Sequence, residues 1–579
     1  MDRLPSKPVR LVQQLSPNER KVAFASICIF GAVLSLDRLT APSYQTVAAS
    51  SLDSHSLLTL VAVVRSIAAA VAGPTSAQLC EMGGLLCAYV AGVVLYAAGC
   101  LVMASAPDIA VFALGGALYE LGANGLIVAQ SVLIASATSP RIRLFSQTLP
   151  QLSFAVLGYP SASIYAAVLK RWGWRSGLGM FAALGPASLL PLLVVMFNGS
   201  RRTVEDLNSA ASPTFDARLR PGWNGTSGDA AARKDEGGAV KPGEQRRPIE
   251  HIVALLRRLW TLLQLADAVG LFLLLCSVAA VLLPLLLAAR EPSGWSSPHI
   301  LLPLVLGLAI LLPAFALWER WGAVRPVLPV DLVRSRAWLL PALVTALFWA
   351  AHAIQGSYLA TYLYVALGAS ARAQQSVAVT YSVADCLFGV VLVSALVRAT
   401  GRLYPFQVLG LAVGVAGIGL MLALRTSSDL ARIAVAQAVL GTAGSLVVAP
   451  LQVSVQVSLD EHRLATAVGA LNLFNALGSA VGSAAAGSIW SGALLPRLSS
   501  QVELTSDDVR SVYSEPLAWI QSHALGSAKR TAVVLAYRGT WTLVLSAAAG
   551  VAGLALLVGL FLPNPILDKE RQDSGPVEG

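Results

Sequence analysis

The stretch AFASICIFGAVLSLDRLTAPSYQT, residues 23–46, determines the class of fold to which this chain belongs. It is long and apolar enough for a bilayer crossing, since a hydrocarbon core about 30 Å thick needs roughly 20 apolar residues in a helix. Two charged residues, Asp37 and Arg38, nevertheless lie well inside it. A charged side chain at mid-membrane is unfavourable by about 2.5–3.5 kcal/mol on insertion scales, so its presence there indicates a function.

The rest of the chain is equally apolar. Of its 579 residues 56% are hydrophobic and 12% are charged, and the mean hydropathy is +0.68. These values exclude an ordinary soluble domain and predict an all-α integral membrane protein. Fourteen windows are long enough to be transmembrane helices: 23–46, 57–78, 85–105, 109–135, 146–168, 177–197, 266–288, 300–320, 339–366, 376–397, 404–424, 431–455, 464–490 and 538–562.

The distribution of basic residues predicts the orientation. With both termini in the cytosol, the inner segments carry 27 of the 41 Lys and Arg residues and the outer loops carry 11. Cytoplasmic loops are enriched in these residues, so we expect cytosolic tails at 1–22 and 563–579. The net charge of +10 then reflects membrane topology, and we expect the bilayer, not a nucleic acid, as the partner.

Two long polar segments interrupt the spans. Residues 198–265 are rich in Arg, Gly, Pro and Ser, which predicts a disordered cytosolic linker between six spans and eight. Residues 491–537 form a long outer loop with some helical pattern around 506–524. Because long loops in compact proteins are usually functional, it is a candidate lid. Glycines four residues apart in several spans, such as Gly478 and Gly482, predict closely packed helices.

The motifs of several functional classes are missing from the sequence. There is no phosphate-binding G-x-x-x-x-G-K-[ST] motif, which makes an ATP-driven pump an unlikely interpretation. No nucleophile, base and orienting group share a recognisable motif, so we do not expect an enzyme. We expect no cofactor, no metal-ligand cluster and, with all six cysteines in spans or at their inner edges, no disulfide framework.

Charges within the spans are the candidates for proton coupling. Asp37 and Arg65 both lie roughly 20 Å above the cytosolic face at 1.5 Å per residue, so adjacent antiparallel helices could pair them. Such a pair could couple proton movement to a conformational change, or it could be a static contact between two helices. Glu120 and Asp385 lie near the middle of their spans without a basic neighbour in sequence, and both are candidates for proton binding.

Two further carboxyl groups, Asp267 and Glu319, lie at inner span edges, where we expect them at the membrane interface.

The span at 339–366 carries the candidates for substrate binding. His352, Gln355, Tyr358 and Tyr362 fall within an arc of roughly 120° if the helix is continuous. A polar and aromatic stripe of this kind suits a wet cavity for a bulky, partly polar ligand, but it also suits a hydrogen-bonded seam between helices. The same two interpretations apply to Asn472 and Asn475, which lie three residues apart in the span at 464–490.

The arrangement of spans and loops resembles the major facilitator architecture. In that fold, residues 23–197 and 339–562 would form two six-helix bundles, and 266–320 would contribute two inserted helices. The resemblance implies a binding cavity at mid-membrane between the bundles, as is usual in secondary transporters.

Particular stretches are similar to the fungal siderophore-iron transporter family of that superfamily. They are LDRLTAPSYQTVAASSLDSHSLL at 36–58, ATSPRIR at 137–143, RWGWRSGLGMFA at 171–182, SYLATYLYVALGASARAQQS at 357–376, AAAGSIWSGALLPRL at 484–498 and AKRTAVVLAYR at 528–538. The resemblance implies uptake of ferric siderophore chelates with protons, by a monomer in the plasma membrane or in an internal membrane. It also implies an outer gate, to which His55 and Tyr513 correspond by position.

One motif departs from the family pattern. The inner loop after the second span is usually A-K-L-x-D-x-x-G-R, and here it is AQLCEMGGL, with Gln78, Glu81 and Leu85 at the charged positions. Because of this departure, two other functions remain as alternatives: proton-coupled efflux of drugs or secondary metabolites, and exchange of glutathione as in a related branch. A nutrient sensor is a weaker alternative, because the tail after the last span is short.

Overall fold

The computed structural model describes residues 15–51, 58–210, 264, 267–288, 296–426, 429–460, 463–514, 516–523 and 526–567. These residues are almost entirely helical. The helices are α2 (Pro17–Ser51), α3 (Leu58–Ser105), α4 (Ile109–Ala137), α5 (Pro140–Thr148), η2 (Leu149–Gln151), α6 (Leu152–Ala210), α9 (Ala268–Leu287), α10 (Pro298–Leu306), η4 (Gly307–Leu311), α11 (Leu312–Trp321), α12 (Val330–Arg334), α13 (Arg336–Gly356), α14 (Leu359–Leu367), α15 (Ala371–Leu387), η5 (Phe388–Val393), α16 (Ser394–Thr400), α17 (Tyr404–Ala423), η6 (Leu424–Thr426), α18 (Leu430–Ser458), α19 (Leu464–Ser499), α20 (Ser506–Ser514), α21 (Pro516–Ser522) and α22 (Ala528–Gly559).

Two of the longest helices reverse direction at a glycine. Gly84 within α3 has φ 78° and Gly173 within α6 has φ 76°, which are backbone angles that residues with a Cβ rarely adopt. Each of these helices therefore contains two consecutive membrane crossings joined by a tight turn. Long apolar sequence forms helices here because each backbone polar group must be satisfied within its own segment in the bilayer.

Within the described residues, eleven helices are long and apolar enough to cross a membrane. Two of them contain the turns at Gly84 and Gly173, and the shorter apolar segment Ala268–Pro284 lies outside this set. The all-helical membrane fold is thus confirmed, and the count of fourteen crossings stays a prediction.

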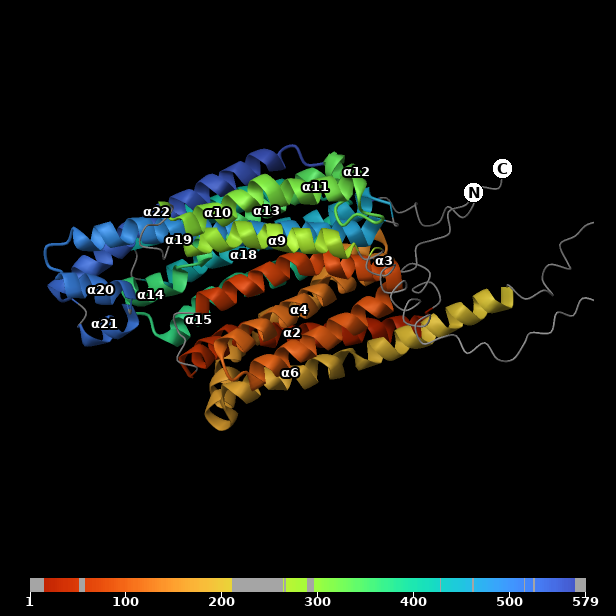
Figure 1. Cartoon of the computed structure of the whole chain (residues 1–579), viewed down its shortest axis with the longest axis horizontal. Coiled ribbons are helices and arrows are strands. Elements are labelled where there is room, and N and C mark those ends of the chain that lie inside the picture. Colours follow the sequence, from red (N-terminus) through yellow and green to blue (C-terminus); the bar gives the residue numbers. More distant parts are fainter. Residues whose placement is uncertain are drawn as a thin grey trace, which may run out of the picture.

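The helices form two bundles that lie side by side (Figure 1). Helices α2 to α6 make the N-terminal bundle, around a core that includes Phe30, Tyr96 and Tyr119. Helices α13 to α22 make the C-terminal bundle, with Tyr362 and Trp541 in its core. The inserted helices α9 to α11 pack against α3 and α19, where the two bundles meet.

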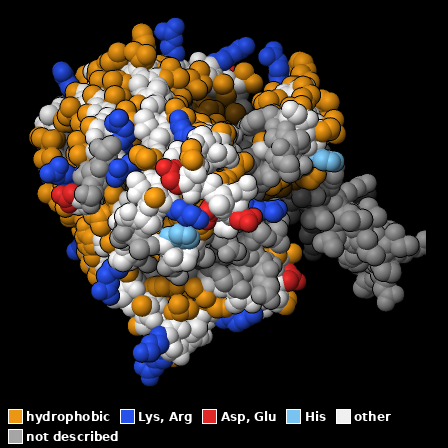
Figure 2. Space-filling model, turned by 90° about the vertical axis from the view of Figure 1, so that its left-hand side faces the viewer, with side chains coloured by type: hydrophobic (Ala, Val, Ile, Leu, Met, Phe, Trp, Pro, Cys, Tyr) orange, Lys and Arg blue, Asp and Glu red, His pale blue; other side chains and the backbone are white. Residues whose placement is uncertain are grey.

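The two ends of the molecule differ. In Figure 1, α20 and α21 project at the left-hand end, and α12 lies at the opposite end. By the orientation that the basic residues predict, the end with α20 and α21 is the outer one, and we name the two ends accordingly. Figure 2 looks onto this outer end, where polar and charged side chains occupy the centre and hydrophobic side chains cover much of the periphery.

Several boundaries differ from those expected. The outer segment 491–537 is not a loop throughout, because α19 continues to Ser499, α22 already begins at Ala528, and α20 and α21 lie between them. Helix α6 continues to Ala210, past the expected end of its span at 197. Hydropathy marks only the apolar part of a helix, and these helices extend into polar sequence beyond it.

The glycine pattern does reflect close packing. An ideal Cβ at Gly122 of α4 would lie 2.3 Å from the backbone nitrogen of Tyr96 in α3. One at Gly478 of α19 would lie 2.1 Å from the carbonyl oxygen of Ala346 in α13. The prediction of small-residue packing faces is therefore confirmed at these crossings.

Candidate functional site

A cluster of charged residues joins α2, α3 and α4 inside the N-terminal bundle. Arg65 forms an ion pair with Glu120, with its Nε donating to Oε1 at 3.1 Å. Arg38 reaches within 3.8 Å of the same carboxylate, and the amide of Asn124 donates to it at 2.7 Å. Two cations and an amide donor surround Glu120, an arrangement that favours its ionised form.

This cluster faces the C-terminal bundle. Asn124 accepts a hydrogen bond from Arg38 at 3.1 Å, and Ser131 lies two helical turns further along the same face of α4. Ser131 in turn accepts a hydrogen bond from Gln452 of α18 at 2.8 Å. The side chain of Arg38 is 34% exposed, so the cluster is connected to accessible space at this face.

Asp37 lies behind the ion-pair cluster and is 1% exposed. Its carboxylate accepts a hydrogen bond from the hydroxyl of Tyr96 at 2.7 Å. The expected pair with Arg65 is wrong, because the Arg65 guanidinium is engaged by Glu120. Depth in the membrane is similar for both carboxylates, and the rotation of each helix decides which of them faces the arginine.

Asp385 belongs to a second buried group, in the C-terminal bundle. An ideal Cβ at Gly444 of α18 would lie 3.0 Å from a carboxylate oxygen of Asp385 and 2.7 Å from the hydroxyl of Tyr381, so both side chains converge on this glycine. The ring of Tyr381 also lies 4.3 Å from that of His352. Beside Tyr381 and His352 lies a cavity of about 20 Å³, enough for roughly one water molecule.

The predicted stripe on the span at 339–366 is broken by the structure. Helix α13 ends at Gly356 and α14 begins at Leu359, so the four side chains do not share one continuous helix face. Gln355 is buried and accepts a hydrogen bond from Gln437 at 3.2 Å. Tyr358 stacks on Trp490 with ring centroids 4.3 Å apart.

Tyr362 continues this seam between helices. It stacks on Trp541 at 5.1 Å and donates its hydroxyl to the carbonyl of Arg425. Of the four stripe residues, His352 and Gln355 line the small cavity. The geometry resembles the interhelical seam more than the wet cavity, and the roles in substrate binding stay predictions.

The two asparagines of α19 have different neighbours. Asn475 accepts a hydrogen bond from Thr345 of α13 at 2.9 Å, within the C-terminal bundle. Asn472 donates to the carbonyl of Val468 at 2.9 Å and lies beside Gly73 of α3, at the junction of the bundles.

The bundles are closed against each other at their inner ends. Gln147 donates to the carbonyl of Ser131 at 3.1 Å and to Gln456 of α18 at 3.4 Å. Helices α3 and α19 cross so closely that an ideal Cβ at Gly73 would lie 2.4 Å from the carbonyl oxygen of Gly469. We call these contacts, together with the Ser131–Gln452 hydrogen bond, the inner gate.

Toward the outer end, a polar cleft opens between the bundles. Tyr159 of α6 and Thr380 of α15 are hydrogen-bonded at 3.2 Å. The cleft beside them has a volume of about 260 Å³ and is lined by Tyr159, Ser163, Arg372 and Gln375 among others. A closed inner gate with an outer cleft corresponds to one state of an alternating-access cycle.

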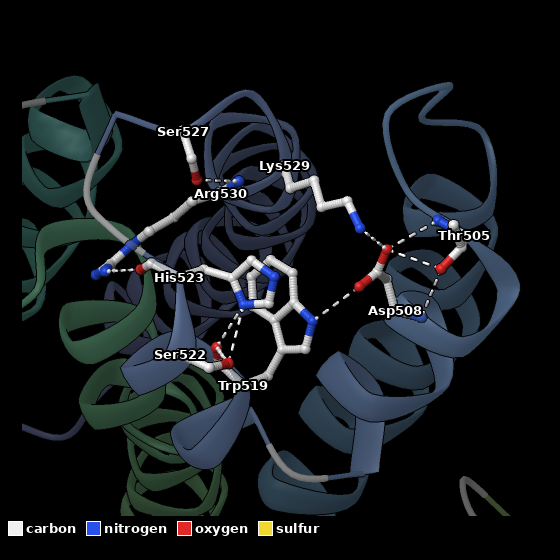
Figure 3. A network of polar contacts seen from close by, with 8 residues as sticks. All are labelled: Thr505, Asp508, Trp519, Ser522, His523, Ser527, Lys529 and Arg530. Atoms are coloured by element: carbon white, nitrogen blue, oxygen red, sulfur yellow. Dashed lines mark hydrogen bonds and ion pairs between the residues drawn. The ribbon is translucent and has the colours of Figure 1, made fainter.

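The outer segment forms a folded cap on the C-terminal bundle (Figure 3). Asp508 of α20 accepts hydrogen bonds from the Thr505 hydroxyl at 2.8 Å, the Trp519 indole at 3.2 Å and Lys529 of α22 at 2.7 Å. Lys529 and Thr505 hold the pKa of Asp508 well below its usual range.

Arg530 secures the other side of this outer cap. Its Nη1 donates to the carbonyl of His523 at 3.0 Å, at the end of α21. The imidazole of His523 stacks on Trp519, with centroids 3.9 Å apart. The two gate candidates fare differently: Tyr513 lies in α20 with 40% of its surface exposed, and His55 lies outside the described residues.

Sequence reasoning missed several members of these clusters. Arg38 was recognised as a charge in a span but not as a partner of Glu120, and Asn124, Tyr96 and Gln452 were not singled out. A signal existed for Asn124, which lies one turn after Glu120 on the same face of an apolar helix. The contacts of Tyr96 and Gln452 join segments far apart in sequence, and no local pattern indicates them.

Comparison with known proteins agrees with this architecture. A family model described as the Major Facilitator Superfamily matches residues 252–483. The chain is 30% identical over 577 residues to MFS siderochrome iron transporter C of Aspergillus fumigatus, covering 96% of this chain and 87% of that protein. It is 26% identical over 527 residues to Siderophore iron transporter 1 of Saccharomyces cerevisiae, covering 90% and 78%.

Among solved structures, the chain is similar to a crystal structure of the peptide transporter POT in complex with sulfate. The TM-score is 0.50 at 15% identity, with 94% of this chain and 96% of that chain covered. This likeness concerns the fold alone. The extensive match to the Aspergillus protein decides the family: the chain is a multi-pass membrane protein that belongs to the siderophore iron transporter family of the major facilitator superfamily.

Proposed function

We propose that this protein imports ferric siderophore chelates across the plasma membrane in symport with protons, as a monomer that works by alternating access. The names of these two relatives specify siderophore iron transport, and the matches extend over nearly the whole chain. A siderophore surrounds its iron with its own oxygen atoms, so the carrier recognises the chelate and needs no metal ligands. Family membership accordingly indicates a transporter rather than an enzyme.

The observation that carries the proton coupling is the position of Asp37. It is buried against Tyr96. Among the described residues no Lys or Arg lies within ion-pair distance of it, although Arg38 and Arg65 act on it electrostatically from farther away. A buried carboxyl group without a cation tends to bind a proton, whereas one held by two arginines tends to stay ionised. Asp37 is therefore the residue that exchanges the proton, and Glu120 is the fixed anion that holds Arg38 and Arg65.

The coupling follows from competition for the arginines. When Asp37 is protonated, Arg38 and Arg65 remain with Glu120 and the bundle keeps the arrangement with a closed inner gate. When Asp37 loses its proton, a second carboxylate attracts the same arginines. Helices α2, α3 and α4 then shift relative to one another, and the face that carries Asn124 and Ser131 transmits the shift to α18. Asp385 is a second candidate proton site, in the other bundle.

The substrate lies between the bundles in this proposal. His352 and Asn472 remain candidates for contacting the chelate, because one lines a cavity and the other lies at the bundle junction. The seam between the helices positions His352 and Asn472, and it is held together by Gln355, Tyr358, Tyr362 and Asn475. Tyr513, exposed on the outer cap, is the remaining described candidate for an outer contact.

Uptake of radiolabelled iron, supplied as several pure siderophores to cells that lack other carriers, tests the proposal. We expect accumulation of at least one chelate, and its loss with a protonophore and in Asp37→Asn. Asp460→Asn, at an exposed position between α18 and α19, is the matched control and keeps wild-type uptake. Extrusion of a toxin without any chelate uptake would contradict import and support the efflux alternative.

A further inference from the structure

Two carboxyl groups meet at the inner end of the inserted helices. Asp267 immediately precedes α9 and is 2% exposed, and Glu319 lies near the end of α11 and is 6% exposed. The two side chains interact electrostatically. Both lie at helix ends, where a position at the membrane interface stays a prediction, and both are enclosed by protein.

Asp267 has an unusual backbone conformation, and one of its two carboxylate oxygens lacks a hydrogen-bond donor among the described residues. Its φ of 47° makes it the one non-glycine residue with positive φ in the described part of the chain. Its Oδ1 accepts hydrogen bonds from the backbone nitrogen of Gly270 at 3.1 Å and from the indole of Trp318 at 2.7 Å. Its Oδ2 is buried and has no donor among the described residues. Backbone strain and an unpartnered buried acceptor are both characteristic of functional positions.

Glu319 connects this pair to the segment 322–329, which we call the strap. Its Oε1 accepts a hydrogen bond from the backbone nitrogen of Val327 at 3.2 Å, and its Oε2 accepts one from that of Leu328 at 3.0 Å. The strap leads from α11 to α12 and packs with α3 and α9 through Val327. Any force that moves Glu319 therefore acts directly on the strap.

The nearby charged residues are engaged elsewhere. Arg320 of α11 lies over the ring of Trp321, with 5.7 Å to the centroid. Arg325 of the strap interacts with Glu81 of α3, and Asp331 of α12 pairs with Arg463 at 3.4 Å. Among the described residues, no cation from α9, α11, the strap or α12 forms an ion pair with Asp267 or Glu319.

The strap also contacts α3 beside the inner gate. The carbonyl of Arg325 accepts a hydrogen bond from the amide of Gln78 at 3.2 Å, at the inner end of the first crossing in α3. One turn further on, Glu81 accepts a hydrogen bond from the hydroxyl of Thr466 in α19. These contacts lie next to the close crossing of Gly73 and Gly469, so a continuous series of contacts joins the carboxyl pair to the junction of the bundles.

The geometry points to a regulatory proton-binding site formed by Asp267 and Glu319, which senses cytosolic pH and controls the inner gate through the strap. This role rests on the proposed transport cycle. One proton shared between the two carboxyl groups supplies the donor that Oδ2 of Asp267 lacks and removes one of two facing negative charges. When the cytosol becomes alkaline, that proton leaves to bulk water, repulsion separates α9 from α11, and the strap releases Gln78.

The substitution Asp267→Asn tests this site with little disturbance. The asparagine keeps a carbonyl for Gly270 and Trp318, its amide donates where the shared proton would lie, and asparagine tolerates the left-handed backbone. In vesicles with fixed outer pH, we expect the wild-type rate of exchange of labelled for unlabelled chelate, which needs no proton gradient, to increase with inner pH, by at most about tenfold per unit for a single proton. The variant keeps the slow low-pH rate at every inner pH, and Asp331→Asn retains the wild-type response.

A measurement on the purified protein without substrate separates this inference from the transport proposal. Infrared difference spectra should show a buried protonated carboxyl group that disappears as the pH rises. The part of the signal that belongs to the Asp267–Glu319 pair is missing in Asp267→Asn and retained in Asp37→Asn, which removes only the contribution of Asp37. Persistence of the full signal and of the pH response in Asp267→Asn would overturn the inference. Stoichiometric binding of Ca²⁺ by the wild type but not the variant would also overturn it, in favour of a metal site.

Discussion

Arg65 lies against Glu120 and not against Asp37, although both carboxyl groups are buried in the same bundle. This relationship divides the carboxylates into an anion that holds two arginines and a neighbour held by a tyrosine. In the proposed mechanism the ion pair has a structural role and Asp37 carries the proton.

The first prediction concerns the stability of this ion pair. Glu120→Gln leaves Arg38 and Arg65 without their carboxylate, and removal of one partner of a buried pair destabilises a protein by about 3–5 kcal/mol. We expect a clear decrease in the thermal unfolding temperature of the detergent-purified protein. Asp331→Asn, at an ion pair with 75% of the aspartate side chain exposed, should cause no measurable change. Equal stability of the two variants would show that the buried pair is unimportant.

A second prediction concerns the inner gate. A valine at Gly73 would force α3 away from α19, since even a Cβ there would lie 2.4 Å from a backbone oxygen. Gly73→Val should therefore favour the conformation with an open inner end and reduce uptake. A cysteine introduced at Gln452 is labelled from the cytosolic side in two backgrounds, the wild type and Gly73→Val. Opening of the gate appears as faster labelling in Gly73→Val. Unchanged labelling would place the gate elsewhere.

The seam in the C-terminal bundle gives a third prediction. Tyr362→Phe removes one hydrogen bond to the carbonyl of Arg425 while keeping the stack on Trp541, so it should destabilise the protein by about 1 kcal/mol. The KM for the chelate should not change, because Tyr362 is buried within the seam. An increase in KM without loss of stability would instead place this hydroxyl in contact with the substrate.

The outer cap gives a prediction of pH dependence. Lys529 lowers the pKa of Asp508 in the folded protein. The ionised carboxylate therefore contributes its full stabilisation above the unfolded-state pKa of about 4, and this stabilisation is lost as the pH falls from there through the lowered folded-state pKa. Hydrogen exchange in residues 505–523, corrected for intrinsic rates, should thus be constant from pH 7 to 5 and faster below pH 4. Asp508→Asn should exchange faster even at pH 7, while the exposed neighbour Asp507→Asn should not.

Much of the fold follows from the sequence because membrane helices are encoded locally. The apolar windows, the glycine crossings and the orientation by Lys and Arg depend on composition within a few turns. The segments beyond the hydrocarbon core are less predictable. A helical pattern around 506–524 indicates α20 and α21, but the extension of α19 to Ser499 and the contact of Asp508 with Lys529 have no local signal.

The partners within the site were harder to predict than its members. The sequence identifies Asp37, Arg65 and Glu120 as charges in the membrane, but depth alone does not determine how each helix is rotated. The prediction that His352, Gln355, Tyr358 and Tyr362 share one helix face is wrong for a different reason. Periodicity assumes a continuous helix, and this helix is interrupted at Ser357 and Tyr358. The burial of Asp267 and Glu319 by protein has no signal in hydropathy, because it depends on contacts such as those of Glu319 with Val327 and Leu328.

The most direct test of the account compares two transport reactions of Asp37→Asn in reconstituted vesicles. We predict that the variant still exchanges labelled for unlabelled ferric siderophore across the membrane, but no longer concentrates it when the outer medium is more acidic than the lumen. If the variant instead accumulates the chelate as the wild type does, with the same sensitivity to a protonophore, Asp37 does not carry the coupled proton and the mechanism is contradicted.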